Sequence, residues 1–101
     1  MRTLMQVKFP TLKATEAMQA ERMPKELDAL VQELKPEATY FYADEGHRSA
    51  LIVFDLKETA QMPAISERLF EMDARINFSP VMNLQELKKG LELLHAQPAH
   101  R

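Results

Sequence analysis

The sequence predicts one α+β domain, in which four antiparallel strands carry helices on one face and a further helix follows at the C-terminus. Segments that alternate in polarity take turns with segments of helical periodicity, in the order β-α-β-β-α-β and then α. The chain of 101 residues has the size of one domain and contains no Gly/Ser-rich stretch that would act as a linker. We therefore expect residues 1–101 to form a single domain.

The first predicted strand covers residues 3–9, which alternate between apolar and mixed positions. Pro10 favours a change to helix there, because proline cannot donate a hydrogen bond to a sheet. Pro24 interrupts the helix that follows, so we expect two helical pieces or a kink near Met23.

Residues 39–55 contain two aromatic and β-branched runs around a turn at Glu45 and Gly46, which predicts a β-hairpin. A two-residue loop at this turn would place Phe41 opposite Ala50. A slip of one residue would turn every side chain of the hairpin to the other face, so the register is the critical expectation.

The second half of the chain predicts a helix over residues 60–72 and a strand over residues 74–79. Pro80 suits an edge strand, where a missing donor costs least. Asn83 and Glu86 have the spacing of a capping box and predict the start of the last helix. Its apolar stripe consists of Leu84, Leu87, Leu91 and Leu94.

This order of elements is that of the ferredoxin-like fold, in which right-handed crossovers place both helices on one face of the sheet. The helix-facing side is predicted to form the core, from Met5, Val7, Phe9, Phe41, Ala50, Ile52, Phe54, Ile76 and Phe78. The opposite face, called the open face below, mixes polar and apolar residues and is the candidate pocket or dimer contact. Its predicted members are Gln6, Lys8, Tyr40, Tyr42, Leu51, Val53, Asp55, Arg75 and Asn77.

The chain resembles a family of uncharacterised bacterial proteins of about this size in the segments ELKPEATYFYADEGHRSALIVFDL, PAISERLF and INFSPVMNLQELKKG. In topology it resembles the dimeric α/β-barrel superfamily, a ferredoxin-like group that includes small monooxygenases and lactone isomerases. The resemblance supports the fold and assigns no activity.

Composition excludes several classes of function. Without cysteine there is no disulfide, thiolate nucleophile or Cys-based metal site. A net charge of −2 argues against nucleic-acid binding, and no apolar run is long enough for a membrane helix. With two glycines, the familiar nucleotide-binding loops are also excluded. We expect a cytoplasmic protein without a metal or cofactor.

The leading hypothesis is a homodimer that is non-catalytic or binds a small molecule, with the open faces forming the contact. In the plainest interpretation Tyr40 and Tyr42 are interface anchors, and Asp55 pairs with Lys8 or Arg75. The last helix would cover its own sheet or pack on the partner.

An alternative function is a cofactor-free monooxygenase or isomerase, in which Tyr42, Asp55 or His47 transfers a proton. His47 lies in the predicted turn, where a histidine is usually just solvated but can also shuttle protons or ligate a metal. His95 and His100 lie in a tail that we expect to fray. A further alternative is a regulatory module that binds an amino acid.

Overall fold

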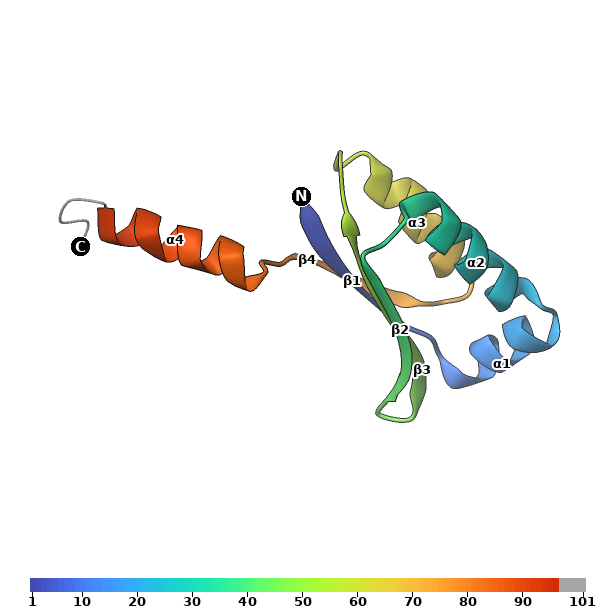
Figure 1. Cartoon of the computed structure of the whole chain (residues 1–101). Helices are drawn as coiled ribbons and strands as arrows, with labels where there is room; N and C mark the ends of the chain where they lie inside the picture. The colour runs from blue at the N-terminus through green and yellow to red at the C-terminus, as the bar shows by residue number, and fades with distance from the viewer. Residues whose placement is uncertain (97–101) are drawn as a thin grey trace.

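In the computed structural model, residues 1–96 are described. They form a four-stranded antiparallel sheet with α1, α2 and α3 on one face (Figure 1). The strands are β1 (Arg2–Lys8), β2 (Ala38–Asp44), β3 (His47–Asp55) and β4 (Arg75–Pro80), and the helices are α1 (Thr11–Gln19), α2 (Arg22–Leu34), α3 (Gln61–Phe70) and α4 (Leu84–Ala96). The strand order is β2-β3-β1-β4, which confirms the predicted ferredoxin-like topology with an added C-terminal helix.

The first helical region is divided, as expected, but the break lies before the predicted position. The chain turns at Glu21, whose φ of 60° is left-handed, and α2 begins at Arg22. Pro24 therefore lies in the first turn of α2, where an amide would have no acceptor within the helix. The proline is accommodated without the loss of a helical hydrogen bond, so the kink near Met23 does not form.

The hairpin has the predicted two-residue loop. Glu45 and Gly46 have φ values of 53° and 79°, as the primed turns of tight hairpins require. Phe41 lies opposite Ala50 in the β2–β3 pairing, which confirms the register. The faces of the sheet follow from this pairing.

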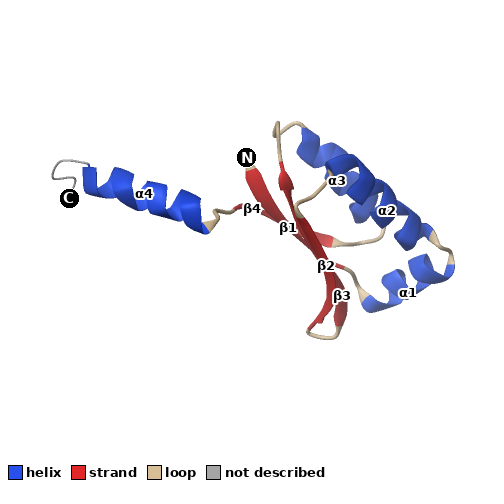
Figure 2. Cartoon of the chain, in the orientation of Figure 1, coloured by secondary structure: helices blue, strands red, loops and turns tan. Residues whose placement is uncertain are grey.

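Figure 2 shows the helices α1, α2 and α3 on one face of the sheet, and the core lies between the two layers. Alternate side chains of β1 and β3 are buried there. The buried residues of β1 and β3, with Phe9 directly after β1, are at most 2 % exposed: Met5, Val7, Phe9, Ala50, Ile52 and Phe54. Phe41 was expected in this core, and that expectation is wrong, because its side chain is 58 % exposed. Ile76 and Phe78 on the edge strand β4 are half-buried and pack against the core.

The last helix, α4, begins with the predicted capping box. The Glu86 amide donates to Asn83 Oδ1 at 2.8 Å, and the Asn83 amide donates to Glu86 Oε1 at 2.9 Å. No residue of α4 is buried, and the helix extends away from the sheet on the side opposite to α1, α2 and α3 (Figure 1). Arg2 forms ion pairs with Glu37 and Glu86 and so links the start of α4 to the sheet.

Two glycine substitutions test the geometry of the hairpin turn. Gly46→Ala should lower the free energy of unfolding by about 1 kcal/mol, because a Cβ at a left-handed residue is strained even where space is free. Gly90→Ala is the matched control: it lies in α4, where alanine favours helix by about 1 kcal/mol. Because no residue of α4 is buried in the chain's own core, this control should raise the helical circular dichroism and should not lower the urea midpoint. Equal midpoints for both variants would contradict the turn geometry.

Candidate functional site

Cross-strand pairing places all nine predicted residues of the open face on one side of the sheet. One row across β2, β3, β1 and β4 consists of Tyr40, Leu51, Gln6 and Asn77. The next row toward the hairpin consists of Tyr42, Ser49, Lys8 and Arg75. Directly opposed residues share a face. The structure therefore brings most of the predicted polar residues together at the hairpin end.

The middle of the open face is apolar. Leu4 lies opposite Val53, and both are half-buried, as is Leu51 in the neighbouring row. Tyr40 is 65 % exposed beside them. A patch of this kind on an otherwise polar surface is typical of a contact with another molecule.

The polar end of the open face contains a depression of about 240 Å³. Lys8 and Arg75 are direct cross-strand neighbours there, and two cations at such positions repel each other. Lys8 Nζ lies 3.1 Å from Asp44 Oδ2 and 3.3 Å from Glu45 Oε1, and these hydrogen bonds raise the pKa of Lys8. Within residues 1–96 no ion pair involves Arg75. Its guanidinium, with the amides of Gln6 and Asn77, suits an anionic or carbonyl group of a ligand.

Asp55 does not belong to this polar cluster. Its carboxylate lies 2.6 Å from the N-terminal amine of Met1, which lowers the pKa of Asp55 through a hydrogen bond and charge attraction. The expected pair with Lys8 or Arg75 is therefore wrong. Tyr42 lies opposite Ser49 of β3, and Asp55 follows Ser49 by six residues. At the rise of a strand these six residues separate the two positions by roughly 20 Å. Tyr42 and Asp55 of one chain are consequently too far apart to act on the same small substrate.

His47 is the first residue of β3 rather than a residue of the turn, and it lies opposite Asp44. Its Nδ1 is 3.1 Å from the Glu45 carbonyl oxygen. In the described part of the chain, no three His, Asp or Glu side chains are grouped to hold a metal ion. His95 lies in the last turn of α4, whereas His100 lies outside the described residues.

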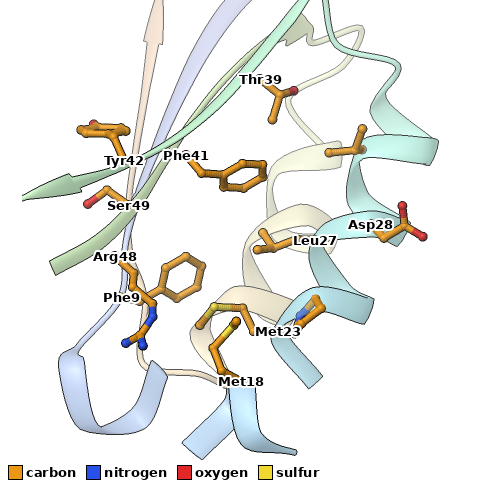
Figure 3. A pocket seen from close by; sticks show the side chains of 12 residues that line it. Phe9, Met18, Met23, Leu27, Asp28, Thr39, Phe41, Tyr42, Arg48 and Ser49 are labelled. Atoms are coloured by element: carbon orange, nitrogen blue, oxygen red, sulfur yellow. The ribbon is translucent and has the colours of Figure 1, made fainter. Parts of the chain in front are cut away.

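A larger cavity, which the sequence did not predict, lies on the helix-facing side, between α2 and the edge strand β2 (Figure 3). It has a volume of about 650 Å³. Phe41 points into it toward α2, with Leu27 and Met23 on the opposite wall (Figure 3). The twelve lining residues are Phe9, Met18, Met23, Pro24, Leu27, Asp28, Val31, Thr39, Phe41, Tyr42, Arg48 and Ser49. We call this cavity the α2–β2 groove.

Of the apolar residues that line this groove, alternation along the strands identified Phe9 and Phe41 and assigned both to a closed core. Because β2 is an edge strand, Phe41 has a neighbouring strand on one side only. The distance between a helix and an edge strand depends on tertiary packing, so the pattern of residues within β2 could not show that Phe41 is uncovered. The nearest signal in the sequence was Pro24, which predicted a break in the helical region that lies beside β2.

Comparison with models of known protein families and with curated proteins finds no match to this chain. No helix among residues 1–96 is long and apolar enough to span a membrane. The function is therefore argued from the two surfaces described above.

Phe54 and Phe41 both lie on the helix-facing side, but Phe54 is buried and Phe41 is exposed. This difference in burial gives a stability test. Phe54→Ala should lower the free energy of unfolding by about 3–5 kcal/mol, because its 1 % exposed ring leaves a cavity. Phe41→Ala should cost less than about 1.5 kcal/mol, because its ring is already largely in water. Urea unfolding followed by circular dichroism measures both. Equal losses would show that the α2–β2 groove is closed in solution.

Proposed function

We propose that this protein is a homodimer that binds a small molecule, in which the open faces of two subunits meet as in the dimeric α/β-barrel proteins. The observation that carries the proposal is the apolar middle of the open face, which no described element of the chain covers. Burial of apolar surface is favourable by about 25 cal/mol per Å², so a second copy that covers this patch gains stability.

A second copy of the chain is the occupant that the geometry favours. Two sheets pack face to face at about 10 Å, and a two-fold axis lets the same patch serve both subunits. The apolar residues Leu4, Leu51 and Val53 would then meet their own counterparts near the axis.

The helix α4 adds to this contact. Four strands of about seven residues present a footprint on the order of 400 Å², whereas a standard interface buries about 800 Å² on each partner. The leucines of the α4 stripe are 43–62 % exposed, and α4 projects into the space in front of the open face (Figure 1). A subunit seated on that face would lie beside α4, so we expect the stripe to pack on the partner.

The polar end of the open face is the proposed ligand site of the dimer. Lys8, Arg75, Gln6 and Asn77 offer hydrogen-bond donors around the depression, and Tyr42 adds a phenol at its rim. When the sheets meet, the apolar middle excludes water while these polar groups line a space between the subunits. A small molecule with an anionic group fits this lining.

The oligomeric state tests the sheet contact. Light scattering should give the wild type a mass of twice 11.6 kDa. Leu51→Glu should give monomers, because the dimer would bury an unpaired carboxylate at the middle of the contact. Phe70→Glu is the control, since Phe70 is 47 % exposed at the end of α3, away from the open face. A monomeric wild type, or a dimeric Leu51→Glu variant, would contradict the proposal.

Two leucines of α4 test the part played by that helix. Leu91→Gln should raise the dimer dissociation constant at least tenfold, because it removes a member of the apolar stripe. Leu93→Gln is the control, because it makes the same change on the other side of the helix. Leu93 follows Leu84 by nine residues, which is about two and a half helical turns, so the two side chains lie on opposite faces. Analytical ultracentrifugation of both variants measures the constants. Equal constants would show that the stripe does not contact the partner.

A further inference from the structure

The α2–β2 groove lies on the helix-facing side of the sheet, whereas the proposed dimer contact lies on the open face, and of the residues that line the two sites only Tyr42 and Ser49 are shared. We propose that this groove binds an amphipathic organic acid, with its carboxylate at Arg48, its apolar body in the groove and a hydrogen-bonding group near Thr39. The ligand class follows from the volume, the lining and the two polar groups.

The volume and the lining favour a small molecule over a protein segment. A cavity of about 650 Å³ falls in the range of about 300–1,000 Å³ that is typical of small-molecule sites. Twelve residues line it, about half of the 20–30 residues on each side of a standard protein interface. Two methionines, Met18 and Met23, form part of the wall, and their flexible side chains adapt to ligands of different shape.

Arg48 gives the groove its charge preference. Its Nη1 donates to Thr15 Oγ1 at 3.2 Å, and no carboxylate of the described residues lies within ion-pair distance of it. Asp28 also lines the groove, but its carboxylate points away from the space between α2 and β2 (Figure 3). A guanidinium has five donors and binds a carboxylate in a bidentate manner. The groove is therefore complementary to an anion at the Arg48 end.

Thr39 marks the other end of the groove. Its Oγ1 is buried and has no hydrogen-bond partner among the described residues, and a buried polar atom without a partner is costly. Arg48 lies opposite Ala43 of β2, and Thr39 precedes Ala43 by four residues. The two ends of the groove are therefore roughly 13 Å apart along the strand. Rotation of the Thr39 side chain would turn this hydroxyl toward the groove, where a ligand whose apolar body ends in a hydroxyl group would satisfy it while the ligand's carboxylate contacts Arg48.

Binding of decanoate and of 10-hydroxydecanoate, measured by calorimetry below their micellar concentrations, tests the proposal. Both acids should bind, and 10-hydroxydecanoate should bind at least fivefold more tightly. Decyltrimethylammonium, which has the same alkyl chain and the opposite charge, should bind at least tenfold more weakly than decanoate. Equal affinities of this cation and decanoate, or no binding of either acid, would overturn the proposal.

Three variants locate the site. Arg48→Gln should weaken decanoate binding at least tenfold, whereas Arg22→Gln, at the side of α2 that faces α3, should leave it unchanged. Thr39→Val, which removes only the hydroxyl group, should abolish the preference for 10-hydroxydecanoate. Equal affinities of the Arg48→Gln and Arg22→Gln variants would overturn the assignment of the anion to Arg48.

A fluorescent variant gives a second readout that does not depend on those substitutions. The chain contains no tryptophan, so Phe41→Trp places a single indole in the wall of the groove. Its emission should shift to the blue when decanoate is added, and an unchanged emission maximum at saturating decanoate would overturn the location. The Leu51→Glu variant should bind decanoate like the wild type, because Leu51 lies on the open face. The result for this groove is thus independent of the result for the dimer.

Discussion

The pairing of β1 with β3 at the centre of the sheet holds Met5 opposite Ile52 and Val7 opposite Ala50, and all four side chains are excluded from water. Because side chains alternate along a strand, this register sends the residues between them to the other face. The open face therefore exists as a consequence of how the core is packed. A shift of one residue would bury Gln6 and expose Met5.

The two edge strands have different surroundings, and this difference produces the uncovered surfaces. On β4, Ile76 and Phe78 pack against the core, whereas Phe41 on β2 remains exposed in the groove beside α2. The last helix, α4, follows β4 and leaves the sheet instead of folding over it. The chain thus presents an apolar sheet face, a leucine stripe and an apolar groove, at places that its described elements do not cover.

Charged residues border the open face at both ends. Among the residues that the structure describes, their ion pairs have a structural role at one end and leave a cation unpaired at the other. At one end Asp55 holds the N-terminal amine while Arg2 joins Glu37 and Glu86, so these charges fix the chain terminus and the start of α4. At the hairpin end Asp44 and Glu45 neutralise Lys8, and Arg75 retains its donors. A ligand on the open face would therefore be recognised at the hairpin end, and the helix-facing groove has a separate cation in Arg48.

The sequence by itself determined the order of elements, the hairpin register, the edge position of β4 and the capping box of α4, because each depends on neighbours in the chain or on alternation with a fixed period. It also determined which residues share the open face, since Tyr40 and Leu51 follow from the two-residue turn at Glu45 and Gly46. Only the tertiary structure decided that Asp55 binds Met1, that Phe41 is uncovered and that α4 stands away from its own sheet. These outcomes depend on distances between elements far apart in the chain, and local periodicity carries no information about such distances.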